Sequence, residues 1–169
     1  SGKQHQPDCR VAAVFPGPRA PGPENALHVV SRVVPAPVQA RAGLDVDRCR
    51  DPEVFAWLRR QTAQGTTIGA LSTGTLLLAR ADVLRGRCTI HWENQRQLIE
   101  EFPGLEVVGD LYCIEGRQMT CGGGIAALDM MLSLIAARHG ATLAAEVAEQ
   151  FLHGRIREST ESQRMDRQW

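Results

Sequence analysis

The feature that most constrains the fold is the alternation of short apolar segments with helical segments after residue 50. The sequence predicts a helix between Asp51 and Gly65, because Asp51 suits an N-cap, Pro52 the first helical position and Gly65 a helix end. Strands are then predicted at 66–71, 88–90, 106–108, 111–114 and 118–120, and helices at 75–81, 93–102, 125–139 and through 143–152. This alternation predicts an α/β fold in which a mostly parallel sheet carries helices on both faces.

Prolines set the first third of the chain apart. Eight of the nine prolines lie in the first 52 residues, so this part is predicted to form strands and turns rather than long helices. The β-branched runs 11–15 and 27–34 are predicted strands, and the Pro/Gly-rich stretch 16–23 between them is a loop. Residues 158–169 are polar and carry no apolar stripe, which is typical of a linker or an exposed tail.

Charge and cysteine content exclude several classes of protein. The chain carries 19 Lys plus Arg and 19 Asp plus Glu, so it lacks the positive surplus of a nucleic-acid-binding module. Its five cysteines are irregularly spaced and include no CxxC pair, so we expect neither a zinc site nor a disulfide scaffold. Scattered thiols of this kind are typical of a reducing cytoplasm. No apolar run is long enough to predict a membrane span.

Three predicted strand-to-helix junctions are the candidate functional sites, because ligands of parallel α/β sheets bind at the carboxyl ends of strands. The first junction is Ser72-Thr73-Gly74. Its serine partly matches the Gly-x-Ser-x-Gly turn that presents a nucleophile, but Ala70 stands where that pattern has glycine. Ser72 is also compatible with an ordinary helix N-cap or with contact to a bound anion.

The second junction is His91-Trp92-Glu93. A histidine at a strand end can act as a base toward Ser72, while an indole face and a carboxylate suit a cationic ligand. The alternative interpretation is that His91 hydrogen-bonds to the backbone and that Trp92 belongs to the core.

The third junction is Cys121-Gly122-Gly123-Gly124. Three glycines before a helix can present N–H groups to an anion such as a carboxylate, or can simply allow a strand and a helix to pack closely. A cysteine at a helix N-terminus can be reactive, but nothing in the sequence sets its pKa. Asp129, one turn into the next helix, is a candidate for orienting a histidine and equally a candidate for the surface.

Several runs of the sequence carry a family resemblance: 69–81, 84–94, 102–103 and 119–132, together with 148–157 and 163–165 near the end. Together they resemble the sensor domain of GlxA-type transcription regulators of the AraC/XylS family. That domain is similar to class I glutamine amidotransferases and to the PfpI/ThiJ superfamily. The resemblance implies a flavodoxin-like three-layer sandwich. It implies that residues 1–157 sense a ligand and that 158–169 lead toward a helix-turn-helix domain outside this chain.

The resemblance also implies a function without catalysis, cofactor or metal. The domain is expected to be a cytoplasmic homodimer in a transcription activator, and to contact DNA only through the absent domain. Similar regulators control the use of arginine, carnitine and glycine betaine, so the expected ligand is a small cationic or zwitterionic metabolite. The expected ligand-binding residues are Ser72, Thr73, His91, Trp92, Glu93, Cys121, Gly122 and Gly123.

The chemistry of such a ligand assigns its two ends to different junctions. Trp92 and Glu93 are expected to hold the cationic nitrogen group, because an aromatic face and a carboxylate both attract a cation. Ser72 and the amides of Gly122 and Gly123 are expected to hold the carboxylate.

Two departures from the family pattern affect these expectations. Enzymes of the superfamily carry cysteine where this chain has Ser72, which favours a sensor that has lost the chemistry. The alternative is a PfpI/ThiJ-type hydrolase or lyase with Ser72 or Cys121 as nucleophile and His91 as base. The buried strand and Gly-Gly turn that the family has before Asp51 are also absent. Because a central strand is hard to delete, we expect residues to be missing from the sequence near 16–25 and 47–51.

Overall fold

The computed structural model describes residues 14–15 and 52–164 of the 169-residue chain. The N-terminal third is therefore represented by strand β1 (Val14–Phe15). The strand predicted at 27–34, the positions near 16–25 and 47–51 where residues are expected to be missing, and Cys9 and Cys49 lie outside the described residues.

The described strands form a four-stranded sheet and a separate two-stranded ladder. In sheet order the four strands are β1, β2 (Thr67–Leu71), β6 (Gln118–Cys121) and β5 (Tyr112–Glu115), and the ladder pairs β3 (Arg87–Cys88) with β4 (Glu106–Val107). The β2–β6 and β3–β4 pairs are parallel, whereas β1–β2 and β5–β6 are antiparallel. The pairing of the described strands is thus mixed, because β5 and β6 form the hairpin that the Glu115-Gly116 turn predicts.

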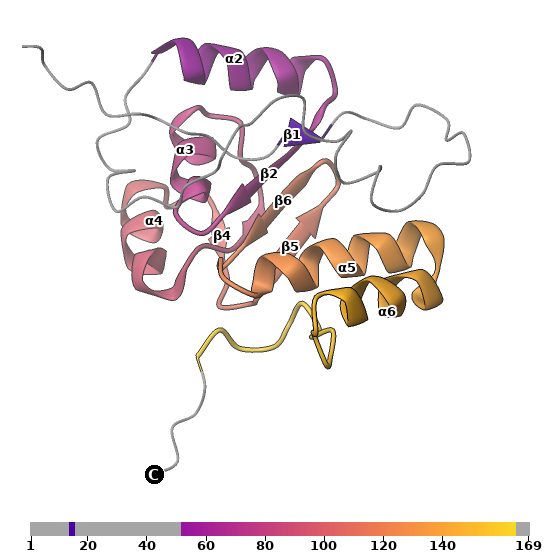
Figure 1. The fold of residues 1–169 in the computed structure, drawn as a ribbon. Helices are drawn as coiled ribbons and strands as arrows, with labels where there is room; N and C mark the ends of the chain where they lie inside the picture. The colour runs from indigo at the N-terminus through magenta and orange to yellow at the C-terminus, as the bar shows by residue number, and fades with distance from the viewer. Residues whose placement is uncertain (1–13, 16–51, 165–169) are drawn as a thin grey trace, which may run out of the picture.

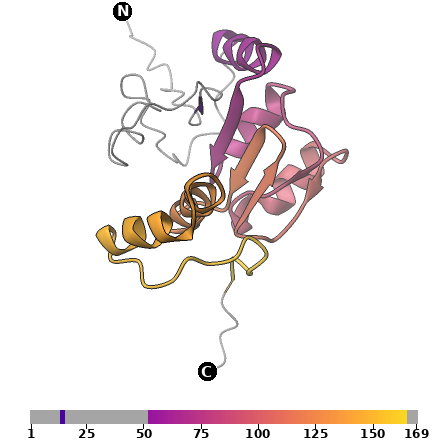
Figure 2. The ribbon, with the colours of Figure 1, turned by 90° about the vertical axis from the view of Figure 1, so that its right-hand side faces the viewer.

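Helices cover both faces of the sheet, as Figures 1 and 2 show. One face carries α2 (Pro52–Ala63), α3 (Gly74–Arg80) and α4 (Gln95–Glu101), the last preceded by the 3-10 turn η2 (Trp92–Asn94). The other face carries α5 (Ala126–His139), and α6 (Ala141–Gln150) packs on α5. The predicted α/β sandwich of three layers is confirmed, and the helices begin and end within a few residues of their predicted limits.

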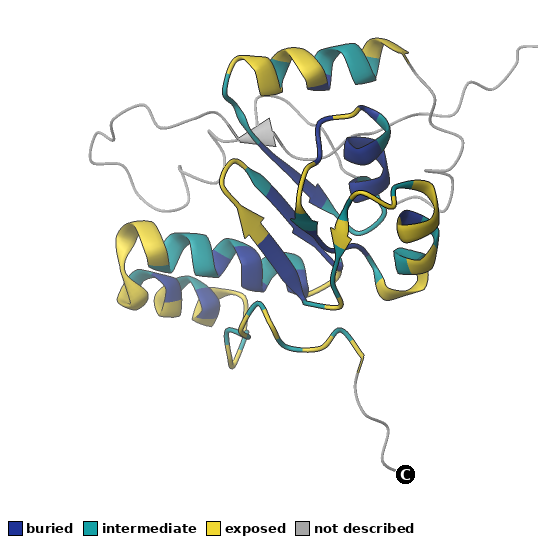
Figure 3. Ribbon diagram, turned by 180° about the vertical axis from the view of Figure 1, so that it is seen from behind, coloured by how far each residue is buried: buried dark blue, intermediate teal, exposed yellow. Residues whose placement is uncertain are grey.

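The alternation of side chains along the central strands divides the core into two parts. Ile68 and Ala70 of β2 pack with the side chains of α2, α3 and α4. Leu71, together with Met119 and Cys121 of β6, packs on α5 instead. Figure 3 shows β2 and β6 buried along most of their length. The polar junctions at their carboxyl ends therefore lie at the rim between two apolar cores.

The cysteines of the described region are free and buried. Burial raises the pKa of the Cys88 thiol to about 11 and that of Cys113 to about 12, so both thiols are protonated at neutral pH and inert. In the described residues, no set of three or more His, Cys, Asp or Glu side chains is placed to hold a metal ion. Likewise, no helix of residues 52–164 combines the length and apolar character that crossing a membrane requires.

Candidate functional site

Ser72 lies on a tight turn directly after β2. Its backbone φ of 55° is in the left-handed region, which costs a non-glycine residue about 1 kcal/mol or more. The turn is fixed on both sides, because the Ser72 N–H donates to the Cys121 carbonyl at 2.9 Å and the Thr75 N–H donates to the Ser72 carbonyl at 3.4 Å. The strand therefore ends in a strained elbow that presents the Ser72 side chain at the start of α3.

The glycine loop after β6 packs directly on this elbow. A Cβ atom placed on Gly123 would lie 2.7 Å from Ser72 Cβ and 3.1 Å from its Oγ, closer than real Cβ atoms approach. Gly123 also has a φ of 92°, which side chains rarely adopt. Glycine is thus required here for close approach, and the first and third predicted junctions lie in contact.

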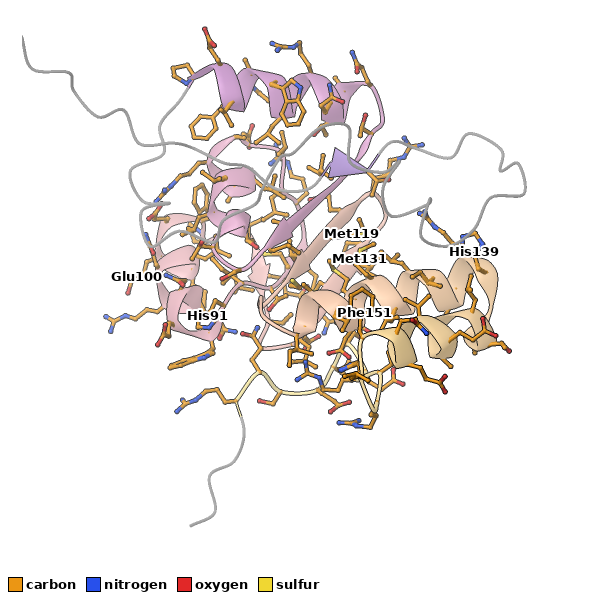
Figure 4. All side chains as sticks on the ribbon, in the orientation of Figure 1. His91, Glu100, Met119, Met131, His139 and Phe151 are labelled. Atoms are coloured by element: carbon orange, nitrogen blue, oxygen red, sulfur yellow. The ribbon has the colours of Figure 1, made fainter. Side chains whose placement is uncertain are left out.

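His91 caps the turn that follows β3. Its Nδ1 accepts a hydrogen bond from the Glu93 N–H at 3.4 Å and lies 3.7 Å from Glu93 Oε2. Figure 4 places His91 beside α4, whereas His139 lies at the far end of α5. Among the described residues, no hydrogen bond joins His91 to the Ser72 hydroxyl or the Cys121 thiol. The backbone-capping interpretation of His91 matches this geometry better than the general-base interpretation.

Cys121 is fully buried at the end of β6. Burial raises the pKa of its thiol, and the backbone N–H groups of Gly123 and Ser72 oppose this rise only in part. A protonated thiol is a poor nucleophile, so the environment of Cys121 does not activate it.

A buried network of threonines connects the ends of three strands. Thr75 Oγ donates to the Thr89 carbonyl at 3.0 Å, and the Thr89 N–H donates to Thr120 Oγ at 2.9 Å. The Thr89 hydroxyl lies within 3.0 Å of the carbonyls of Val108 and Asp110. These buried hydroxyls are hydrogen-bonded to backbone groups at the strand ends, which would otherwise lack a partner. They thereby hold the three junctions in a fixed arrangement. Periodicity gives no signal for such a network, so Thr75, Thr89 and Thr120 were not among the predicted site residues.

The chain's own C-terminal segment reaches into this arrangement. Gln163 Nε2 lies 2.8 Å from Thr89 Oγ, 2.9 Å from the Ile90 carbonyl and 2.8 Å from the Asp110 carbonyl. Its side-chain carboxamide also lies over Gly122, where a Cβ would meet Gln163 Cδ and Oε1 at 2.6 Å. Residues 158–169 were predicted to form a linker or an exposed tail. Of these, 158–164 lie below the sheet (Figure 1) and hydrogen-bond to Gly109 and Leu111 in the loop before β5.

The neighbouring Arg164 contacts the second junction. Its guanidinium carbon lies 5.2 Å from the centre of the Trp92 ring, a cation–π distance. Trp92 is 42% exposed, so the alternative that it belongs to the core is wrong. The Glu93 side chain beside it is also exposed.

The backbone amides predicted to bind a carboxylate are already engaged. The Gly122 N–H donates to the Leu111 carbonyl at 2.8 Å, the Ser72 N–H to Cys121, and the Gly123 N–H faces the Cys121 thiol. The side-chain hydroxyls of the first junction, those of Ser72 and Thr73, are better placed for a ligand. Within the described part of the chain, Thr73 Oγ is buried without a hydrogen-bond partner, which is a cost that a ligand acceptor or donor can remove.

Asp129 is fully buried, so of its two interpretations the surface position is wrong. It does orient a histidine, but the partner is His153, whose Nε2 lies 2.7 Å from Asp129 Oδ1. Arg157 completes the cluster through its backbone N–H at 2.9 Å and its guanidinium Nε at 2.8 Å. Although burial alone raises the pKa of Asp129, these hydrogen bonds and the charge of Arg157 hold it below its ordinary value.

A cavity of 230 Å³ lies elsewhere, between β5, α5 and the segment around 158–159. Its walls include Arg87, Tyr112 and Ser133, and none of the predicted site residues. The space beside the predicted junctions is instead filled by the Gln163 side chain.

Parts of this sequence are similar to known proteins. The profile of the DJ-1/PfpI family matches residues 43–137. The HTH-type transcriptional regulator CdhR of Pseudomonas aeruginosa is 42% identical over 125 residues, which are 73% of this chain and 37% of that protein. The HTH-type transcriptional regulator GlxA of Rhizobium meliloti is 42% identical over 108 residues, which are 63% of this chain and 33% of that protein.

A solved structure shares the fold. The AraC family transcriptional regulator from Pseudomonas putida superposes with a TM-score of 0.56 at 28% identity, covering 61% of this chain and 56% of that one. The matched part of this chain spans only about a third of the length of the curated relatives. The resemblance to GlxA-type regulators is confirmed, and the chain belongs to the DJ-1/PfpI family.

Proposed function

We propose that this chain is the ligand-sensing domain of a transcriptional regulator, and that it binds a small metabolite carrying a cationic nitrogen group and a carboxylate. The regulatory role is supported by the names of the relatives. In the whole protein, a homodimeric cytoplasmic activator, residues 158–169 join this domain to a separate helix-turn-helix domain that contacts DNA.

The observation that carries the ligand class is the contact of Arg164 with Trp92. A half-exposed indole that already holds a guanidinium offers a surface on which a quaternary ammonium or guanidinium group is attracted by the ring electrons. The exposed carboxylate of Glu93, next in the chain, adds charge attraction.

The carboxylate of the ligand belongs at the elbow. The hydroxyls of Ser72 and Thr73 supply donors there, and the Thr73 hydroxyl has no other partner in the described residues. The glycine loop that touches Ser72 leads into α5, whose N-terminal end carries the positive side of the helix dipole. Binding is better supported than catalysis, since no base within the described residues is hydrogen-bonded to the Ser72 hydroxyl and the Cys121 thiol is held protonated.

Isothermal titration of the 169-residue chain with glycine betaine, L-carnitine and L-arginine tests the proposal. Replacing Trp92 with alanine removes a cation–π contact of about 1 kcal/mol, so the affinity should fall roughly fivefold. Trp92→Phe keeps an aromatic face and should lose less. Unchanged affinity in Trp92→Ala would contradict the assignment of the cation, and binding of none of the three probes would contradict the ligand class.

A further inference from the structure

Residues 158–164 are docked on the domain through backbone contacts as well as side chains. The Leu111 N–H lies 2.9 Å from the Ser159 carbonyl and 3.1 Å from the Glu161 carbonyl, and Ser162 forms an isolated antiparallel bridge with Asp110. The Gln163 N–H donates to the Gly109 carbonyl at 3.4 Å. The segment is therefore held against the loop that precedes β5, at the same edge of the sheet as the junctions.

One side chain of this segment covers a group assigned above to the ligand, and its neighbour in the chain lies on the adjacent glycine loop. The Gln163 carboxamide lies over Gly122 and reaches the carbonyl of Ile90, the residue before His91. The Arg164 guanidinium lies on Trp92. The segment thus already places a cation where the cationic group of the metabolite is expected to bind.

We infer that segment 158–164 is an internal competitor of the ligand, and that binding of the metabolite releases it from the edge of the sheet. The inference rests on the proposed function. An incoming cationic group needs the face of Trp92 that Arg164 covers, and two cations cannot share one face without repelling each other.

The contacts to be displaced are individually weak. Arg164 is exposed, and a cation–π contact between exposed groups is worth little. Gln163 makes neutral hydrogen bonds to carbonyl groups that water can also satisfy. By contrast, residues up to Arg157 are held by the buried Asp129. Release is therefore limited to the part of the chain after Arg157, which is the part proposed to lead to the DNA-binding domain.

A competitor inside the protein reduces the apparent affinity for the ligand by the fraction of molecules in which the site is open. Removing both contacts in the double variant Gln163→Ala/Arg164→Gln should therefore raise the affinity for glycine betaine, L-carnitine or L-arginine, by about tenfold. Arg96→Gln is the matched control, because Arg96 is an exposed arginine on α4 that pairs only locally with Glu100. This control should bind like the original chain.

Hydrogen exchange supplies a second readout in the unmodified chain. The Leu111 N–H is protected by carbonyls of the segment, so saturation with the bound probe should speed its exchange several-fold, along with that of peptides covering 158–164. Thermal unfolding of the double variant checks that the domain remains folded.

The outcomes separate the two proposals. Tighter binding by the double variant, with faster Leu111 exchange on ligand binding, supports the competitor. Equal affinity in the original chain and the double variant, or unchanged exchange at Leu111, overturns it and leaves the proposed function standing. Binding of no probe by either protein overturns the ligand class and the competitor with it.

Discussion

The segment after α6 is held at its two ends by different interactions. Near its start, the buried Asp129 carboxylate accepts hydrogen bonds from His153 and Arg157. Near its end, Gln163 makes neutral hydrogen bonds and Arg164 lies on an exposed indole. Breaking a buried ion cluster costs several kcal/mol, whereas an exposed cation–π contact contributes about 0.5–1 kcal/mol. The chain after α6 is therefore firmly held at Arg157 and only weakly held at Arg164, where another cation can take the place of the guanidinium.

The largest effect is expected at the anchored end. Asp129→Ala leaves His153 and Arg157 without their carboxylate and should lower the free energy of unfolding by about 3 kcal/mol. Chemical denaturation measures this difference. Glu100→Ala, which removes an exposed carboxylate paired with Arg96, serves as control and should change stability little. A loss in Asp129→Ala no larger than in this control would show that both ends are held equally weakly.

Acid should reduce the contribution of the Asp129 cluster to the free energy of unfolding. Since the pKa of folded Asp129 lies below its ordinary value of 3.8, the cluster stabilises the fold fully above that value. Its contribution disappears as the pH falls through the lower, folded-state pKa. The stability difference between the original chain and Asp129→Asn should therefore persist at pH 5 and shrink below 3.8. A difference that already vanishes at pH 5 would contradict the direction of this shift.

The smallest effect on stability is expected at the exchangeable end. The three atoms nearest to a Cβ on Gly122 would all belong to the flexible tip of Gln163, so Gly122→Ala should cost less than about 1 kcal/mol while speeding exchange of the Leu111 N–H. Gly123→Ala is the contrasting variant, because its Cβ would meet Ser72 at a left-handed backbone position and should destabilise the fold more. Slow Leu111 exchange in Gly122→Ala would mean that Gln163 does not hold the segment.

Local signals predicted most of the secondary structure. Pro52 begins α2, and the turn at Glu115-Gly116 closes the β5–β6 hairpin, because the fixed φ of proline and the freedom of glycine act within a few residues. The buried side of α5 is set by tertiary packing instead. Asp129, Met130 and Leu132 are all buried, because α5 lies between the sheet and α6 and is covered on more than one side.

The residues at the strand ends of the candidate site were predicted, but the side chains that the C-terminal part of the chain adds to it were not. The contact of Ser72 with Gly123 follows from the rule that parallel strands end at one edge, and both residues were predicted as site residues. The partners of Asp129 lie 24 and 28 residues further along the chain, beyond the reach of any periodic pattern. Gln163 lies in a polar stretch without a stripe, so hydrophobic patterning gives no reason to dock it. Its place in a run resembling the family was the available signal.

The three acceptors around Gln163 have a kinetic consequence. A primary amide has two N–H hydrogens, so Thr89 Oγ, the Ile90 carbonyl and the Asp110 carbonyl cannot all be served by it at the same instant. One of them is always available to water or to another donor. An arriving molecule can therefore exchange hydrogen bonds with Gln163 one at a time, and no step requires all of them to be broken at once.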